Sequence, residues 1–385
     1  MSRMLGDIFS SGWEQVTEFL RSILPCSTKS VSQMYDVEME ISDLHHEAKN
    51  GNVGKVEALL EQPDIQVNEE KEINGLSYTP LLIAAKYGHD KVVELLLKVD
   101  DIQVNLARKS SGCTPLYMAA QNGHLEVVEK ILQKYDIDVN KTKHEATPLM
   151  IAASNGHEKI VELLLRRDDI APAINKACCC KCTPLYLAAQ NGFEQIVHQL
   201  MGRNDTDVNQ TSFMGATALL IAARNGHRKV VENLLRRKDI QVNKPWNVTG
   251  ATPLFLATQW GHASVVNLLL NHRDIQVNKA GHRGINPLIV AHNNKDVELV
   301  GILLEKVTKP VYQNSECLVC LDRRPNVVLI PCGHQNLCGV CASRWKKQGK
   351  GCPLDRMTIG YIHKFPAIQF NAIKFSAMYT KYKEE

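Results

Sequence analysis

The chain has 385 residues, of which 44% are hydrophobic and 22% charged, so it is long enough for two or three domains with a sizeable core. Its 45 Lys and Arg residues barely outnumber its 41 Asp and Glu residues, and no basic run is long enough to follow a phosphate backbone. The composition therefore argues against nucleic acid as a partner.

Residues 1–35 are predicted to form an amphipathic helix and a linker. Apolar residues recur at helical spacing from Leu5 to Leu24, with a break at Gly12. The polar face of this helix is not rich in Lys or Arg. We therefore favour packing on the following domain over binding to a membrane surface, and both alternatives stay open.

The N-terminal region and the cysteine distribution both predict an intracellular, most simply cytoplasmic, protein. Asp7, Glu14 and Glu18 interrupt any apolar core of a secretory signal. No apolar run approaches the roughly 20 residues of a membrane-spanning helix. The 12 cysteines are clustered and not evenly spread, with six between Cys317 and Cys352, which is unlike a secreted disulfide scaffold. We expect reduced thiols.

From residue 42 onward, a short phrase recurs at steps of 33 to 36 residues. The phrase is Thr-Pro-Leu or a close variant, and it begins at Thr79, Thr114, Thr147, Thr183, Thr217, Thr252 and Asn286. A Gly followed by His, or once by Phe, keeps the same period at Gly88, Gly123, Gly156, Gly192, Gly226 and Gly261. Self-similarity at this period predicts a solenoid of stacked helical units.

Each part of the repeat has a physical role. Thr79 is expected to cap a helix and Pro80 to occupy its first turn, where a missing N–H costs nothing. Gly88 is expected to end that helix in a left-handed conformation. A second helix and a polar hairpin, introduced by phrases such as Asp-Ile-Gln-Val-Asn, complete the unit.

This pattern resembles the ankyrin repeat over residues 42–308, in about eight units including degenerate ends. The first unit lacks Thr-Pro-Leu, and the last has Asn293 and Asn294 where the others have Gly. Such departures suit terminal repeats, which need a polar outer face. The repeated His is expected to pack and to form hydrogen bonds, not to act in catalysis.

The resemblance implies that the array binds a protein substrate through its hairpins and inner helix face. The residues just before each Gly are expected to face the partner, and most of them are Asn. Tyr87 and Trp260 are the aromatic exceptions, and Trp246 lies in a hairpin segment. These three are the candidate substrate-binding residues, with packing on their own repeat as the alternative.

Cys178, Cys179, Cys180 and Cys182 crowd into one hairpin segment. Four thiols could bind a metal, oxidise or be acylated. Adjacent cysteines do not easily converge on one tetrahedral ion, however, and no His lies beside them. We therefore expect no functional role for this cluster.

Near the C-terminus, eight potential zinc ligands fall within fewer than forty residues. In order they are Cys317, Cys320, Cys332, His334, Cys338, Cys341, Cys352 and Asp355. Zinc prefers four tetrahedral ligands drawn from thiolate, imidazole and carboxylate, so this set is enough for two ions. A segment this short has little core, and metal binding would have to stabilise it by on the order of 10 kcal/mol.

This ligand order resembles the RING finger of E3 ubiquitin ligases. The resemblance implies cross-brace pairing, in which Cys317, Cys320, Cys338 and Cys341 hold the first zinc ion. The second zinc ion would be held by Cys332, His334, Cys352 and Asp355. The family usually has Cys at the position of Asp355; a carboxylate is an acceptable zinc ligand, and water could complete the site if Asp355 does not bind.

The resemblance also implies the function of a RING-type E3 ubiquitin-protein ligase, with an E2 enzyme and ubiquitin as partners. Leu318, Trp345 and Pro353 would form an apolar shelf for the E2, and Arg356 would bridge E2 and ubiquitin. Such ligases position a charged E2 and form no covalent intermediate, so no catalytic nucleophile is expected. The alternative is a non-enzymatic ankyrin scaffold or adaptor whose zinc finger only binds a protein.

Together these patterns predict a mainly α fold: an ankyrin solenoid of helix-turn-helix and hairpin units, followed by a small zinc-stabilised RING domain. The RING is assigned to residues 312–358 and an apolar tail to residues 359–385. The tail carries eight Ile, Tyr and Phe residues from Ile359 to Phe375. It could mediate a homodimer.

Overall fold

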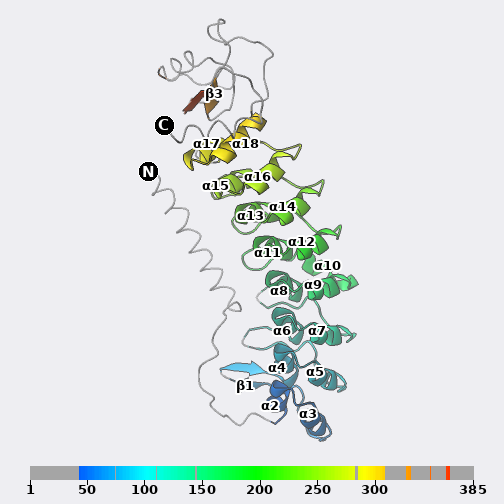
Figure 1. Ribbon diagram of the computed structural model, residues 1–385. Helices are drawn as coiled ribbons and strands as arrows, with labels where there is room; N and C mark the ends of the chain where they lie inside the picture. The colour runs from blue at the N-terminus through cyan, green and yellow to red at the C-terminus, as the bar shows by residue number, and fades with distance from the viewer. Residues whose placement is uncertain are drawn as a thin grey trace.

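The computed structural model describes residues 43–307, apart from 74, 110, 144 and 282–284, together with residues 327–330, 347 and 361–364. Across residues 43–307, the described chain forms eight antiparallel helix pairs that stack along one axis (Figure 1). The predicted mainly α solenoid is confirmed. The predicted N-terminal helix of residues 1–35 and the tail of residues 359–385 lie outside the described residues, except for the short strand at 361–364.

The helices form two rows (Figure 1). The first row holds the opening helix of each pair: α2 Asp43–Asn50, α4 Pro80–Tyr87, α6 Pro115–Asn122, α8 Pro148–Asn155, α11 Pro184–Asn191, α13 Ala218–Asn225, α15 Pro253–Gln259 and α17 Pro287–Asn293. The second row holds the returning helix: α3 Val53–Leu60, α5 Asp90–Leu97, α7 Leu125–Leu132, α9 Glu158–Leu165, α12 Glu194–Met201, α14 Arg228–Leu235, α16 Ala263–Leu270 and α18 Val297–Val307. Each helix packs on its neighbours in the same row.

Strands are few and short among the described residues. β1 (Lys71–Ile73) pairs antiparallel with β2 (Leu76–Tyr78) in the first hairpin, with Lys71 opposite Tyr78. β3 (Val327–Ile330) pairs antiparallel with β4 (Tyr361–Lys364) near the C-terminus. Between α9 and α11, a 3-10 turn η1 (Asp168–Ile170) and the short helix α10 (Ala171–Ile174) replace the turns found at this place in the other repeats.

The opening helices begin as predicted. In α4 the hydroxyl of Thr79 accepts a hydrogen bond from the Leu82 N–H at 3.2 Å, and Pro80 occupies the first turn. Asn286 takes the place of Thr at the start of α17 and accepts from the Ile289 N–H at 3.0 Å. These side chains satisfy backbone donors that a helix start otherwise leaves unpaired.

The opening helices end at a left-handed residue. Gly88, the cap of α4, has φ +82°, and the other repeat glycines have similar positive values. In the last repeat this position belongs to Lys295, with φ +57°, one residue beyond the predicted Asn293 and Asn294. The positive charge at the end of α17 suits the negative end of a helix dipole.

The repeated histidines join neighbouring repeats. His124 Nε2 lies 2.9 Å from the Lys86 carbonyl oxygen of the preceding repeat, and His157 Nε2 lies 3.1 Å from that of Gln121. A carbonyl oxygen only accepts, so Nε2 must carry the proton. Each ring lies against the glycine of the preceding repeat, where a Cβ on Gly123 would come within 2.5 Å of the His157 ring. The expected packing role of the histidines follows from these contacts.

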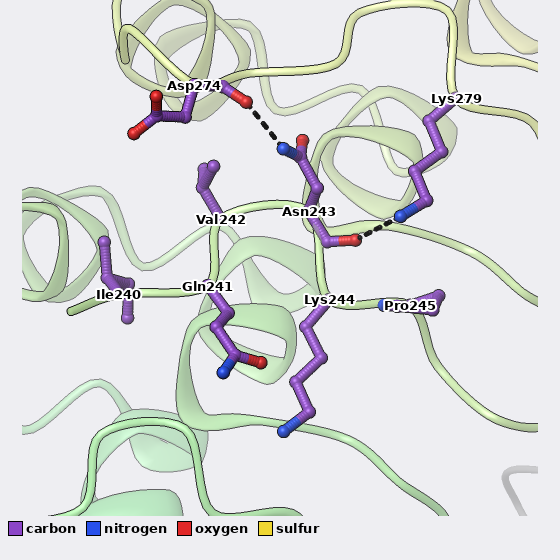
Figure 2. A pocket seen from close by; sticks show the side chains of 8 residues that line it. All are labelled: Ile240, Gln241, Val242, Asn243, Lys244, Pro245, Asp274 and Lys279. Carbon is purple, nitrogen blue, oxygen red and sulfur yellow. Dashed lines mark hydrogen bonds between the residues drawn. The ribbon is translucent and has the colours of Figure 1, made fainter.

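The hairpin segments are tied together by asparagines. The Asn243 side chain donates to the Asp274 carbonyl at 2.6 Å and accepts from the Gln276 N–H at 2.8 Å. Figure 2 shows the bond from Asn243 to Asp274. It also shows a further hydrogen bond between the two repeats, in which Lys279 Nζ donates to the Asn243 carbonyl at 3.1 Å. Asn68, Asn105 and Asn209 make the same pair of bonds to their next repeats.

The core is a single cluster that runs the length of the array. Paired alanines such as Ala84 and Ala85 are fully buried on the opening helices, where small side chains let adjacent helices approach closely. Val and Leu residues of the returning helices fill the space between repeats. Among the described residues, no helix combines the length and apolar character needed to cross a bilayer.

Replacing Gly123 with alanine should destabilise the array by about 2–3 kcal/mol. The left-handed backbone costs a non-glycine residue about 1–2 kcal/mol, and the new Cβ must displace the His157 ring and its hydrogen bond, worth about 1 kcal/mol. Urea unfolding followed by circular dichroism measures the change.

Gly54→Ala is the matched control. Gly54 lies within α3, and a Cβ there would have no heavy atom within 4 Å. Alanine is the better helix former by about 0.5–1 kcal/mol, so this variant should be as stable as the wild type or slightly more so. Equal loss in both variants would refute the role assigned to Gly123.

Candidate functional site

The predicted zinc ligands lie outside the described residues. They are Cys317, Cys320, Cys332, His334, Cys338, Cys341, Cys352 and Asp355. The same holds for the predicted E2-contacting residues Leu318, Trp345, Pro353 and Arg356. Their assignment therefore stays a prediction from the sequence.

Two described strands flank the last six of these eight positions in the sequence, whereas Cys317 and Cys320 precede both strands. β3 ends at Ile330, two residues before Cys332, and β4 begins at Tyr361, six residues after Asp355. The register places Ile330 opposite Tyr361. This pairing is compatible with Cys332 and Asp355 contributing to one site, as cross-brace pairing requires.

The chemistry of the donor set fits zinc. Thiolate and imidazole predominate, and both are preferred zinc ligands. Seven of the eight positions hold Cys or His. Asp355 supplies a harder oxygen donor, which zinc also accepts. If all eight positions bind as predicted, each ion has four protein ligands and no position open for a substrate, which is typical of a structural site.

On the ankyrin array, two of the three predicted aromatic residues are exposed. Tyr87, at the end of α4, is 44% exposed, and Trp260, which caps α15, is 49% exposed. The Arg224 guanidinium lies 5.3 Å from the Trp260 ring centre, a cation–π arrangement that orients the indole. Both residues therefore belong to helices of the first row, α4 and α15.

Tyr87 and Trp260 are far apart along the solenoid. Four opening helices, α6, α8, α11 and α13, separate α4 from α15. At the usual helix spacing of about 8–10 Å, this corresponds to roughly 40–50 Å. One compact contact cannot include both residues, so a partner that uses both must be an extended segment or a large surface.

Trp246 does not belong to this surface, and its prediction as an exposed contact is wrong. Its side chain is only 5% exposed and belongs to the core. The backbone N–H of Trp246 donates to the Ala251 carbonyl at 2.8 Å. This bond closes the hairpin loop, and Trp246, the first residue of the loop, turns inward. Arg108, Lys143 and Ser212 open the corresponding loops and are buried as well.

The asparagines before each glycine also have a structural task. Asn155 donates to the Gln121 carbonyl at 2.8 Å, and Asn225 donates to the Gln190 carbonyl at 2.8 Å. Asn191 makes the equivalent bond to Ser154 at 2.9 Å. These side chains link repeats, so the row of residues before the glycines is less available for partners than the sequence pattern suggests.

A pocket lies between two adjacent hairpin segments, with Val242, Asn243, Asp274 and Lys279 among its lining residues (Figure 2). Its polar groups already join the two repeats, since Asn243 bonds to Asp274 and Lys279 bonds to Asn243. The pocket is open to solvent. The hydrogen bonds that Asn243 makes here are also made by the equivalent asparagines of other repeats. We therefore assign it to the architecture and not to ligand binding.

The cysteine hairpin brings its thiols together, contrary to the sequence-based expectation. The sulfur atoms of Cys178, Cys179 and Cys180 lie within 4.8 Å of one another. A hydrogen bond from the Cys182 side chain lowers the pKa of the Cys178 thiol, against the opposing effect of burial. The same hydrogen bond, followed by burial, raises the pKa of the Cys182 thiol.

Sequence reasoning also missed exposed apolar side chains on the array. Tyr135, in the segment after α7, is 95% exposed, and Phe213, in the loop after α12, is 72% exposed. The Phe213 N–H donates to the Cys180 carbonyl at 2.9 Å, so this exposed ring lies beside the cysteine hairpin. Neither residue stands in a repeated phrase, so only a structure reveals its exposure.

Two family models match the chain. The model described as "Ankyrin repeats (3 copies)" matches residues 44–143, 140–212, 185–280 and 219–315, more than half of the chain. The model described as "Zinc finger, C3HC4 type (RING finger)" matches residues 313–362. The second description implies Cys at all of the last four ligand positions, whereas this chain has Asp355 in the eighth.

Several curated proteins resemble short parts of the chain. The E3 ubiquitin-protein ligase XIAP of Xenopus tropicalis is 38% identical over 65 residues, covering 17% of this chain and 12% of that protein. The E3 ubiquitin-protein ligase NEURL3 of Rattus norvegicus is 34% identical over 59 residues, covering 15% and 23%. The probable E3 ubiquitin-protein ligase MGRN1 of Danio rerio is 32% identical over 56 residues, covering 14% and 11%. The chain thus spans less than a quarter of each of these relatives.

Proposed function

Since the chain belongs to the ankyrin-repeat family and carries a RING finger at its C-terminal end, we propose that it is a RING-type E3 ubiquitin-protein ligase. In this proposal the ankyrin array captures a protein substrate. The RING holds an E2 enzyme charged with ubiquitin, so that a lysine of the substrate can attack the thioester.

The observation that carries the proposal is the RING ligand order. Seven Cys and His residues and one Asp follow the expected sequence of positions within the segment that the RING family model matches. Short matches to three proteins named as E3 ubiquitin ligases or probable ligases support it. Because these matches cover small parts of each protein, the ligase activity of the whole chain rests on the module and not on overall similarity.

Zinc would supply the folding energy of this module. Cys317, Cys320, Cys338 and Cys341 would hold one ion. Cys332, His334, Cys352 and Asp355 would hold the second. Binding of a structural zinc ion contributes on the order of 10 kcal/mol, which a segment of about fifty residues needs, since its apolar core is small.

The proposed catalytic effect is positioning. Leu318, Trp345 and Pro353 would form the apolar shelf on which the E2 docks. Arg356 would donate hydrogen bonds to E2 and ubiquitin together, for which the planar guanidinium with its five donors is suited. Fixing the thioester in an orientation open to attack lowers the entropic barrier of a transfer whose nucleophile is a lysine of another protein. No cysteine of this chain carries ubiquitin in this mechanism.

The array would supply the substrate specificity. Tyr87 and Trp260 are exposed aromatic residues on the same helix row, and aromatic residues are frequent energetic anchors of protein interfaces. Since they are separated by four repeats, we propose an extended substrate segment along this row. The closely spaced free thiols suit a reducing compartment, so we place this activity inside the cell.

A non-enzymatic scaffold is the second candidate. In that case the zinc finger would only bind a protein partner, and no E2 would be recruited. The joint presence of Leu318, Trp345, Pro353 and Arg356 favours the ligase, because a zinc-stabilised binding module needs neither the Trp nor the Arg at these positions.

An in vitro ubiquitination assay over a panel of E2 enzymes tests the proposal. Purified full-length protein with its zinc content measured should form ubiquitin chains with at least one E2. Absence of chains with every E2, in protein that contains two zinc ions per chain, would favour the scaffold. An Asp355→Ala variant that holds zinc as tightly as the wild type would remove Asp355 from the ligands.

A further inference from the structure

Cysteine has a simple explanation at only one of the four positions in the hairpin of residues 178–182. Cys182 directly precedes the Thr183 helix cap and is 4% exposed. The same position holds Cys113, Ala146, Ala216 and Ala251 in other repeats, all of them buried. The position is buried in these repeats and also at Tyr78, so Cys182 is explained as a side chain that fills the core there.

Packing does not require cysteine at the other three positions, although Cys178 is buried in the core. Cys178 opens the loop, with its N–H bonded to the Cys182 carbonyl at 3.1 Å. The corresponding residue is Arg108, Lys143, Ser212 or Trp246 in other repeats, so the position accepts very different side chains. Cys179 is exposed, and Cys180 is half-buried against the edge of the core, so neither is enclosed by it.

The loop geometry makes the three thiols converge. The Lys181 N–H donates to the Cys178 carbonyl at 2.7 Å, and Lys181 takes a left-handed conformation with φ +56°. This tight turn brings the sulfur atoms of Cys178, Cys179 and Cys180 within 4.8 Å of one another. The Phe213 N–H of the next repeat fixes the turn by donating to the Cys180 carbonyl.

The sulfur spacing suits a shared metal ion. Thiolates that each lie about 2.3 Å from one ion are roughly 3.8–4.0 Å apart, in tetrahedral or trigonal geometry. The Cys179 and Cys180 sulfur atoms are 3.8 Å apart. Cys178 needs only a small side-chain adjustment to reach the same spacing, since its sulfur is already within 4.8 Å of both. The exposure of Cys179 leaves a route for the ion from solvent.

We propose that Cys178, Cys179 and Cys180 form a three-thiolate binding site for a thiophilic metal ion, Cu(I) or Zn²⁺, in the ankyrin array. Soft thiolate ligands select these ions over Mg²⁺ or Ca²⁺. Binding breaks the S–H bond of each coordinating thiol and releases its proton to solvent, with no change in oxidation state. The site shares no ligand with the RING.

Metal titration of the full-length protein tests this proposal. The variant carries Cys178→Ser, Cys179→Ser and Cys180→Ser together and leaves Cys182 and the RING cysteines in place. It should fold, because Ser212 occupies the position of Cys178 in the next repeat and the other two residues are not in the core. Unfolding by urea checks this. Reduced protein is titrated without oxygen, with Cu(I) in one arm and Zn²⁺ in the other, against a competing chelator.

Wild-type protein should bind about one more ion per chain than the triple variant in at least one arm, and that arm identifies the metal. Cys113→Ser, which changes a buried cysteine in another hairpin, should bind as much as the wild type. Equal uptake by the wild type and the triple variant in both arms would overturn the proposal. The ubiquitination assay is a separate readout, so the ligase activity can fail or succeed independently of this result.

Discussion

Replacing Trp345 with alanine should reduce ubiquitin chain formation strongly while leaving the zinc content unchanged. The proposed shelf for the E2 contains one large aromatic side chain, and truncation of such an anchor typically costs about 2 kcal/mol or more of binding free energy. That corresponds to a loss of roughly thirtyfold in E2 affinity. Chain formation at limiting E2 concentration and zinc measured in the same sample check the result.

Cys332→Ala is the informative companion to this variant. It removes a predicted zinc ligand, so it should lose both chain formation and about one zinc ion, whereas Trp345→Ala should lose chain formation alone. Full activity of Trp345→Ala at limiting E2 would contradict the docking role given to this residue. Unchanged zinc in Cys332→Ala would contradict its assignment as a ligand.

Leu149→Ala should destabilise the array by about 2–5 kcal/mol. Leu149 lies in α8 near the middle of the solenoid and is fully buried, so its truncation loses apolar burial and leaves a cavity. The energy of a repeat protein is close to a sum of repeat and interface contributions, so weakening a central repeat reduces the coupling of the two halves. We expect an earlier and broader urea transition.

Leu76→Ala is the control for that experiment. Leu76 lies in β2 of the first hairpin and is 38% exposed, so its truncation should change stability by about 0.5 kcal/mol or less. A loss at Leu149 as small as the loss at Leu76 would mean that the central interface contributes little to folding.

Much of the array was predictable because local interactions repeat. The Thr side chain caps the same helix in repeat after repeat, as the bond from Leu82 N–H to Thr79 shows, and Gly88 ends that helix with positive φ. Self-similarity reveals such features because each copy obeys the same local constraint. The fold class was therefore within reach of the sequence, and it is confirmed.

Backbone features at unusual residues were not predictable in this way. Glu145, Lys181 and Lys295 all have positive φ, a conformation that a sequence pattern assigns to glycine. Glu145 and Lys181 stand just before the end of hairpin loops whose counterparts use Gly112, Gly215 or Gly250. Their conformation is imposed by loop closure and by the packed helices on either side, which single-residue preferences do not record.

The candidate sites also include features that the sequence predicted and features that it did not. Trp246 was a candidate contact because it lies in a hairpin segment, but its backbone N–H closes the loop and its side chain lies in the core. The thiols of the cysteine hairpin were not expected to converge easily on one tetrahedral ion, because they are adjacent in sequence and no His lies beside them. The turn around Lys181 brings them together. The RING ligand order, in contrast, needs no structure to be recognised, because it is a matter of spacing.

The most direct test of the central claim is the discharge of a purified E2–ubiquitin thioester onto free lysine. This reaction needs neither the substrate nor knowledge of what the ankyrin array binds. Zinc-loaded wild-type protein should accelerate discharge from at least one E2, and Trp345→Ala should leave it near the rate without ligase. Basal discharge from every E2 in the presence of zinc-loaded wild-type protein would contradict the claim that this RING positions a charged E2.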